Sequence, residues 1–375
     1  MTREDVPWRL KHILLIVVGW VVALSLFSMV AVNRFNIEKD TAYPWIIGGM
    51  AVEHKAWNPL TYLYRWDSYW YMNIATEGYS FNPAVPGLYN VVFFPLYPLL
   101  LACVSKILFL PMIAAGVLVS IISLVGACWF LYRLVAEQFP RVHAKRVVLS
   151  LLIFPTAIFL TAVYTEALFL FLSVASFYYA RKKRWWMAGL FGGLAALTRI
   201  NGIILFLPLL YSYLTTEKNN PDRPSIASIF LVPLGTCLYF LYLRISFGDF
   251  LLFFKAESMW GRVVGSNNFI SSFVTHPAVV NSVLDGCFLL FAITMMVLTW
   301  RRLGTSYGLY MLGTITLVVA SGSVAGIGRY ILVLFPMYIL AAGIKNEFIQ
   351  TAWILISTLL FALYVILFVN GYWTG

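Results

Sequence analysis

Long apolar runs recur along the whole chain, and they constrain its fold more than any other feature. Runs of about 17 to 25 residues are long enough to cross a bilayer as a helix. Hydrophobic residues make up 61% of the chain and charged residues only 11%. A soluble core cannot bury that much apolar sequence, so we predict an all-α polytopic membrane protein. The first run, from about residue 12 to 32, is too long for a signal-peptide core and is expected to remain as the first span.

The formal net charge of +11 follows the expected topology. Basic residues gather in segments on one side of the spans, such as Arg9 and Lys11, the run 181–184, and Arg301 with Arg302. The positive-inside rule places these segments in the cytoplasm. Charge with this distribution needs no nucleic-acid partner, and we expect none. The four cysteines and four histidines have no disulfide or zinc spacing.

The same rule gives one membrane domain over residues 1–375, with about 11 transmembrane helices and its C-terminus outside. Segment 91–109 is expected to be a partly embedded helix on the outer side, and 112–134 a clean span. Segment 185–214 has two arms of only about 14 residues each. The sequence does not decide whether they form short helices or a re-entrant element. Two long outer loops are expected, at 33–90 and 248–277.

This topology has a consequence for function. The topology rests on basic residues in the inner loops alone, yet it brings Asp67, Glu166, Arg199 and Arg329 to the outer face. Ionisable residues are costly within a membrane, where they usually mark functional sites. We therefore expect an outward-facing polar cavity.

Asp67 is the strongest candidate for a catalytic group, because it lies among aromatic residues in the first outer loop. A carboxylate in a partly dry pocket can act as a general base towards an incoming hydroxyl. Trp66, Tyr69 and Trp70 would offer flat apolar faces to a sugar ring or a lipid. The alternative is an interfacial aromatic belt with Asp67 paired to Arg65.

The other charged candidates also have two interpretations. Glu166 could bind a metal or order a substrate, or it could begin a helix with Thr165 as its cap. Arg199 and Arg329 could clamp a phosphate, or they could be snorkelling or structurally paired. In the second outer loop, Lys255 and Arg262 could meet a lipid-phosphate headgroup or form a solvated loop face. The full set of candidate substrate-binding residues is Arg65, Trp66, Tyr69, Trp70, Arg199, Asn201, Lys255, Arg262, Arg329 and Tyr330.

A cofactor is not evident from the sequence. The chain has no Asp-x-Asp pair. The sequence leaves open whether the protein binds a divalent ion, Mg²⁺ or Mn²⁺. Asp67 and Glu166 are the candidate ligands.

Four motifs, in order, resemble a known family, the PIG-V-type mannosyltransferases. Trp66 and Asp67 followed by Ile74-Ala75 and Gly78-Tyr79 resemble its first motif, and FFPLYPLL at residues 93–100 resembles its second. The third is the stretch from Pro155 to Phe169, with Thr165 where the family has Ser, and the fourth is Thr198 to Gly202. The similarity covers roughly residues 60–210. From 225 onwards, only Arg329-Tyr330 near Phe335-Pro336 resembles wider GT-C enzymes.

The resemblance implies a GT-C-like fold with a catalytic acid in the first outer loop. It implies inverting transfer of a sugar, usually mannose, from a polyprenyl- or dolichyl-phosphate donor to a hydroxyl of a glycolipid or cell-envelope glycan. By matching motif, Asp67 becomes the general base, Glu166 an auxiliary acid, and Arg199 and Arg329 donor-phosphate contacts. The short chain and modest loops favour a bacterial relative in the plasma membrane, with the endoplasmic reticulum as the eukaryotic equivalent.

Two rival functions remain at this stage. A transporter or flippase of a lipid-linked sugar would use the same cavity without a base, and often shows inverted repeats, which we do not find. A scaffold subunit of a glycosylation complex would need no essential acid.

Overall fold

The computed structural model describes residues 7–34, 58–82, 87–140, 142–218, 225–263 and 279–374. Every regular element within these ranges is helical. The elements are α1 (Leu10–Arg34), α2 (Pro59–Tyr62), α3 (Ser68–Glu77), η2 (Asn90–Val92), α4 (Leu96–Leu108), α5 (Met112–Gln138), α6 (Ala144–Leu152), η3 (Ala157–Leu160), α7 (Glu166–Arg181), α8 (Trp185–Ala196), η4 (Ile200–Leu205), α9 (Phe206–Thr216), η5 (Ile226–Ser228), α10 (Leu231–Phe247), α11 (Leu252–Met259), α13 (Val279–Arg302), α14 (Thr305–Ala320), α15 (Ile327–Leu332), α16 (Pro336–Ala342) and α17 (Glu347–Val369).

Four of the described helices are long and apolar enough to cross a membrane: α1, α5, α13 and α17. The pair α10 and α11 would add a fifth span if it were counted as one, but it bends by 85°. The predicted first span and the span at 112–134 are confirmed as α1 and α5. The predicted number of about 11 spans is not confirmed, because several apolar segments form short helices instead of full crossings.

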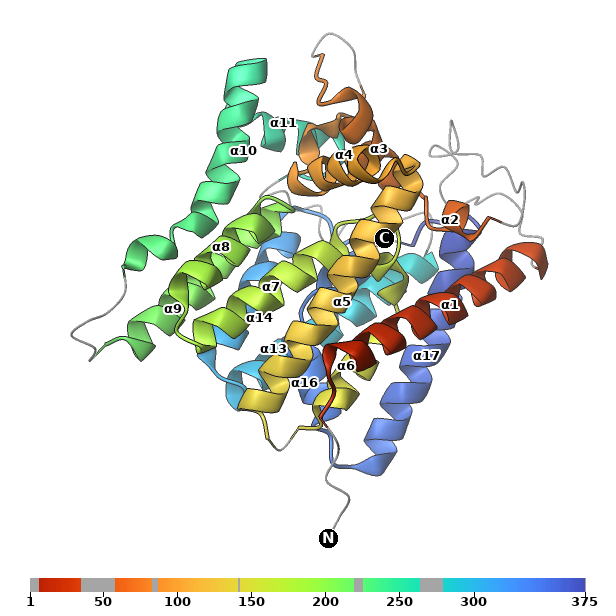
Figure 1. Ribbon diagram of the computed structural model, residues 1–375, viewed down its shortest axis with the longest axis vertical. Coiled ribbons are helices and arrows are strands. Elements are labelled where there is room, and N and C mark those ends of the chain that lie inside the picture. Colours follow the sequence, from red (N-terminus) through yellow and green to blue (C-terminus); the bar gives the residue numbers. More distant parts are fainter. Residues whose placement is uncertain are drawn as a thin grey trace.

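The segments that were difficult to assign from sequence are such short helices. Segment 91–109 contains η2 and α4, and α4 has 13 residues. A helix of that length is about 20 Å long, less than the ~30 Å of a hydrocarbon core. Figure 1 shows α3 and α4 lying across the upper end of α5, as expected of a partly embedded element. Segment 185–214 contains α8, η4 and most of α9, with a break between Ala196 and Ile200.

The predicted outer loops are described only in part. Residues 35–57 and 83–86 of the first loop, and 264–277 of the second, lie outside the described residues. The parts that are described, α2, α3 and α11, lie at the same end of the helix bundle (Figure 1).

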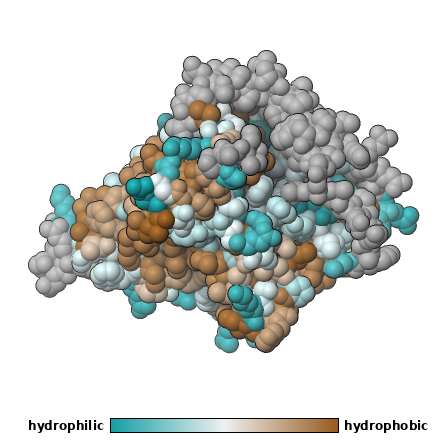
Figure 2. All heavy atoms as spheres, turned by 90° about the horizontal axis from the view of Figure 1, so that it is seen from above, coloured by the Kyte–Doolittle hydropathy of each residue, from teal (hydrophilic) through white to brown (hydrophobic). Residues whose placement is uncertain are grey.

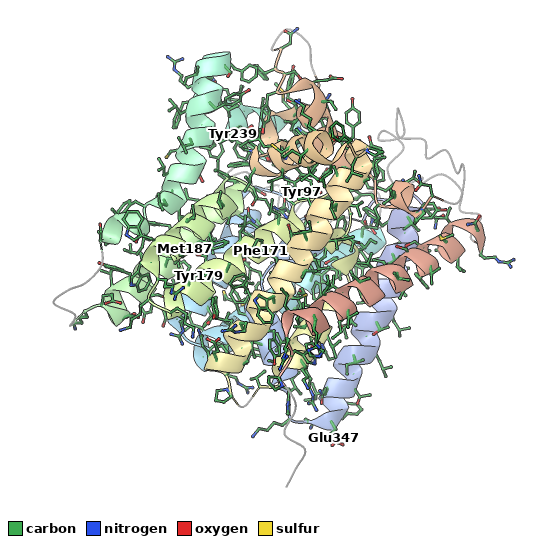
Figure 3. The ribbon with its side chains drawn as sticks, in the orientation of Figure 1. Tyr97, Phe171, Tyr179, Met187, Tyr239 and Glu347 are labelled. Atoms are coloured by element: carbon green, nitrogen blue, oxygen red, sulfur yellow. The ribbon has the colours of Figure 1, made fainter. Side chains whose placement is uncertain are left out.

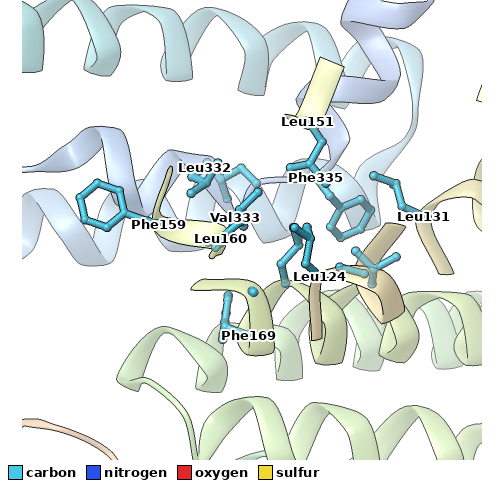
Figure 4. Close-up of a cluster of buried hydrophobic side chains, with 14 of the residues drawn as sticks. Leu124, Leu131, Leu151, Phe159, Leu160, Phe169, Leu332, Val333 and Phe335 are labelled. Carbon is cyan, nitrogen blue, oxygen red and sulfur yellow. The ribbon is translucent and has the colours of Figure 1, made fainter. Parts of the chain in front are cut away.

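The core is a bundle in which α5 and α7 lie along each other (Figure 1). Side chains from several elements meet there, including Leu124 and Leu131 of α5, Phe169 of α7 and Leu332 of α15 (Figure 4). Where α4 meets α5, the hydroxyl of Tyr97 lies 2.9 Å from Ser120 Oγ (Figure 3). Hydrophobic side chains cover much of the face seen in Figure 2, with hydrophilic ones gathered in patches. Along the candidate spans, large hydrophobic side chains such as Leu15 of α1 and Leu359 of α17 are exposed, which suits contact with lipid.

Small residues bring α8 and α10 together. A Cβ added at Gly189 would lie 1.7 Å from the Ser228 carbonyl oxygen, and one at Gly193 2.6 Å from that of Leu231. Backbones that approach this closely are typical of helix packing in membranes, where small residues make the contact. The sequence of α8 therefore sets how near the 225–247 segment can lie.

Gly189→Ala should destabilise the protein by about 1–3 kcal/mol, because the added methyl overlaps a backbone oxygen that cannot rotate away. Gly19→Ala in α1 is the matched control, since nothing lies within 4 Å of the Cβ added there. Thermal unfolding of both variants in detergent, followed by tryptophan fluorescence, measures the difference. Equal unfolding temperatures for the two variants would contradict the close approach.

Candidate active site

Four charged side chains that are distant in sequence meet in one cluster. Arg329 Nη1 donates to Asp67 Oδ2 at 2.8 Å, while its Nε and Nη2 lie 3.0 Å and 2.9 Å from Glu166 Oε1. Arg199 Nη1 donates to the same Glu166 oxygen at 2.9 Å. Two carboxylates and two guanidiniums thus balance each other in charge. The expectation that these four residues come together is confirmed, and we call them the ionic cluster.

Exposure differs across the ionic cluster. The side chain of Glu166 is fully buried, and those of Arg329 and Arg199 are 8% and 12% exposed. Asp67 is the most accessible member, at 16%. Glu166 Oε2 is buried without a hydrogen-bond partner. Asp67 is therefore the more accessible acid of the ionic cluster, whereas Glu166 is buried and pairs with both arginines.

Aromatic rings surround the guanidinium of Arg329. Its Cζ lies 4.6 Å from the ring centre of Tyr164 and 4.9 Å from that of Phe159. Rings at this distance attract a cation and also exclude water from it. The hydrogen bonds of Arg329 are consequently stronger than they would be in solvent.

Tyr330 connects the ionic cluster to the segment that follows α11. Its ring lies 5.0 Å from Arg199 Cζ and 5.3 Å from Arg262 Cζ, and its hydroxyl accepts from Arg262 Nη1. Burial lowers the pKa of Arg262, but the neighbouring Tyr330 and Glu257 outweigh this effect, so its pKa stays above the ordinary value. Tyr330 and Arg262 thus adjoin the ionic cluster.

Two predicted site residues lie elsewhere. Lys255 Nζ pairs with Asp249 Oδ2 at 2.5 Å, and its side chain is 67% exposed. Arg65 is buried, and its guanidinium donates hydrogen bonds to the backbone carbonyls of Thr61, Tyr64 and Val369. The alternative in which Asp67 pairs with Arg65 is wrong, because Arg65 is held by these carbonyls and Asp67 by Arg329.

The two residues before Asp67 are held by residues 369–373, at the end of α17 and just after it. Arg65 Nη2 donates to the Val369 carbonyl at 2.8 Å, and Trp66 Nε1 donates to that of Tyr372 at 3.2 Å. The Trp66 ring meets Trp373 edge-on, with centroids 5.3 Å apart. Trp66 has φ of +50°, a left-handed conformation that costs a non-glycine residue about 1–3 kcal/mol. We call Val369, Tyr372 and Trp373 the C-terminal clamp, because it holds Trp66 in this conformation and so directs Asp67.

The aromatic residues of α3 differ in their availability. Trp70 stacks on Phe93 at 6.1 Å and meets Trp260 edge-on at 5.4 Å, so much of its ring is packed. Tyr69 is 44% exposed. Of the two, Tyr69 has the more accessible face for a ligand.

Local backbone breaks explain how helices deliver the charged groups. Glu166 is the first residue of α7, and Thr165 precedes it without a side-chain capping bond. Arg199 is extended between α8 and η4, and Gly202 fits against the Ala196 backbone, where a Cβ would lie 2.4 Å from its Cα. Asn201 is buried beside it, and its Nδ2 has no hydrogen-bond partner.

Sequence reasoning missed Tyr164, Phe159 and Asp285 as contributors to this region. The two aromatic residues lie within the third motif, but the sequence assigned them no role, because their role depends on contact with Arg329. Asp285 did give one, because it is a lone acid within an apolar run. Its Oδ2 accepts from the backbone N–H of Gly326 at 3.2 Å.

Comparison with known proteins identifies the family of this chain and a structure of similar fold. The family model for "Mannosyltransferase (PIG-V)" matches residues 11–218, more than half of the chain. The GPI alpha-1,6-mannosyltransferase 2 proteins of Mus musculus and Rattus norvegicus are 32% and 31% identical over 162 residues. That match spans 40% of this chain and 31% of each relative.

The chain belongs to the PIG-V mannosyltransferase family. Its fold is similar to that of the GT-C protein ArnT from Cupriavidus metallidurans, solved with undecaprenyl phosphate bound. The TM-score is 0.50 at 13% identity, over 95% of this chain and 76% of that one. Together with the apolar helices, these matches make the chain an integral membrane protein.

Glu166→Gln should destabilise the protein by about 3–5 kcal/mol, because Arg199 loses its carboxylate partner and Asp67 is left as the one carboxylate of the ionic cluster for two buried guanidiniums. The matched control is Glu137→Gln. Glu137 also pairs with two cations, Arg133 and Lys182, but its side chain is 28% exposed, and such a pair contributes only ~0–1 kcal/mol. Thermal unfolding in nanodiscs compares the two losses, and similar shifts would contradict the buried position of Glu166.

Proposed function

We propose that this protein is a membrane glycosyltransferase that moves mannose from a polyprenyl- or dolichyl-phosphate donor to a hydroxyl of a glycolipid or glycan acceptor. The ionic cluster carries the proposal, because it sets an accessible carboxylate directly against guanidiniums suited to phosphate. Membership of the PIG-V family supports the sugar. The undecaprenyl phosphate bound to the ArnT of similar fold supports a lipid-linked donor. The proposed location is the outer face of a bacterial plasma membrane, or the lumenal face of the endoplasmic reticulum.

In the proposed mechanism, Asp67 takes the proton of the acceptor hydroxyl. The hydroxyl oxygen forms a bond to the anomeric carbon from the face opposite the lipid phosphate. The bond from that carbon to the phosphate oxygen breaks, and its electron pair leaves with the phosphate. The configuration at the anomeric carbon is therefore inverted.

Arg329 has two roles in this mechanism, because it binds Asp67 before the donor arrives and the donor phosphate afterwards. In the structure it binds Asp67 through Nη1. A donor phosphate arriving at Arg199 and Arg329 would compete for that group, and Asp67 would lose a hydrogen bond as the phosphate gains one. The base would thus be released only when the donor is present, which limits wasteful reaction with water.

The residues do not favour a resident metal ion. Within the described ranges, no three His, Cys, Asp or Glu side chains come together in a way that could hold one. Arg329 also lies between the carboxylates of Asp67 and Glu166 and already bonds to both. We propose that Arg199 and Arg329 supply the positive charge that stabilises the leaving phosphate.

Asp67→Asn should lower the rate of transfer by about 10²–10⁴-fold, as expected for loss of a general base. The test uses purified protein in nanodiscs, radiolabelled polyprenyl-phosphate-mannose and a membrane lipid extract, with label followed by chromatography. Asp249→Asn is the control, since Asp249 pairs with exposed Lys255 away from the ionic cluster. Transfer by Asp67→Asn at the rate of the unsubstituted protein would remove Asp67 from this role.

The same assay separates the proposed function from its rivals. A transporter would leave the labelled lipid covalently unchanged while moving it across the bilayer. A scaffold subunit would show neither new product nor movement. The appearance of a new labelled product that depends on Asp67 is the outcome that a transferase alone predicts.

Exhaustive treatment with a chelator should leave the transfer rate unchanged, because the arginines provide the cationic charge. The measurement compares initial rates in EDTA with those in added Mg²⁺ or Mn²⁺. A rate that vanishes in EDTA and returns with either ion would contradict the assignment of phosphate stabilisation to Arg199 and Arg329.

A further inference from the structure

Asp285 is a carboxylate inside an apolar helix, and the mechanism above does not use it. It lies in α13, near the start of the candidate span 281–302. An acid within such a helix costs free energy, so the group that Asp285 binds indicates its role. That partner is the backbone N–H of Gly326, which lies 3.2 Å from Asp285 Oδ2.

Gly326 begins the short helix that carries Arg329. It is the N-cap of α15, with φ of +71°, and its carbonyl accepts from the backbone N–H of Arg329 at 3.0 Å. The turn that Asp285 holds is therefore bonded directly to the residue that binds Asp67 and Glu166.

A second residue of α13 holds the same turn. Phe288 lies three positions after Asp285, so the two share one face of the helix. A Cβ added at Gly328 would lie 3.2 Å from the Phe288 ring and 2.9 Å from Thr156 Cγ2. Thr156 Oγ1 also donates to the Gly328 carbonyl at 2.8 Å. The turn from Gly326 to Arg329 is thus enclosed on several sides.

We propose that Asp285 is a positioning residue that fixes the start of α15 and thereby places the Arg329 guanidinium between Asp67 and Glu166. The proposal rests on the proposed function for its kinetic consequence, but not for its structural one. Asp285 acts through a hydrogen-bond acceptor, so an asparagine at this position keeps the role, whereas an apolar residue of similar size loses it.

The experiment compares Asp285→Leu and Asp285→Asn with the unsubstituted protein in nanodiscs. Thr294→Val is the control on the same helix, because Thr294 is exposed and its hydroxyl donates to the Leu290 carbonyl within its own helix. Hydrogen–deuterium exchange of a peptide covering residues 321–332 reports on the turn without any need for activity. We expect faster exchange there in Asp285→Leu alone.

Kinetics then show whether the turn positions Arg329. We expect kcat/KM of Asp285→Leu to fall by up to about 10²-fold, as a small misplacement of a binding group can cause, and Asp285→Asn to stay close to the unsubstituted rate. In an Arg329→Lys background, Asp285→Leu should have little further effect, because the guanidinium that it positions is already gone.

The outcomes are distinguishable. Unchanged exchange in Asp285→Leu overturns the proposal, as does faster exchange with unchanged kcat/KM or a fully additive loss in the double variant. Loss of activity in both Asp285→Asn and Asp285→Leu would also overturn it, by showing that the charge itself is required. If no transfer is detected with the unsubstituted protein, the proposed function fails, while the exchange measurement still decides whether Asp285 holds the turn.

Discussion

The guanidinium of Arg329 is the contact on which the arrangement of the charged residues depends. It bonds to Asp67, which directly precedes α3, and to Glu166 from the start of α7, and Arg199 reaches the same Glu166 oxygen. Each charge loses solvation on burial, and the opposite charges of the ionic cluster compensate this cost together with the aromatic rings. Removing one member therefore disturbs the rest, so the four residues act as one unit.

The surrounding fold is organised to make that contact possible. Helices stop short where charged residues must enter: α7 begins at Glu166, α8 ends before Arg199, and α15 is only six residues long. Irregular backbone within a membrane protein is tolerated where protein or a wet cavity satisfies its polar groups. The short helices, which make the number of spans difficult to predict, are thus the elements that bring the charged residues of the ionic cluster together.

Much of this was predictable from sequence, and the limits have physical reasons. The spans at α1 and α5 followed from hydropathy, because a bilayer imposes a minimum length. The meeting of the four charges followed from topology, because the positive-inside rule assigns each turn a side. Which acid pairs with which arginine did not follow, since pairing depends on side-chain geometry. Arg65 is adjacent to Asp67 in sequence, yet it bonds to the carbonyl of Val369 instead.

The C-terminal clamp has a consequence for how the protein is made. Trp66, which precedes Asp67, is held by Tyr372 and Trp373, and these residues leave the ribosome about 300 positions later. The contact with Trp66 can therefore form only after α17 has been synthesised and has docked beside it. A nascent or truncated chain would contain every residue of the ionic cluster and still lack the contact that orients Asp67. The contacts around Asp67 are thus complete only after α17 has docked, although all four residues of the ionic cluster precede α17 in the chain.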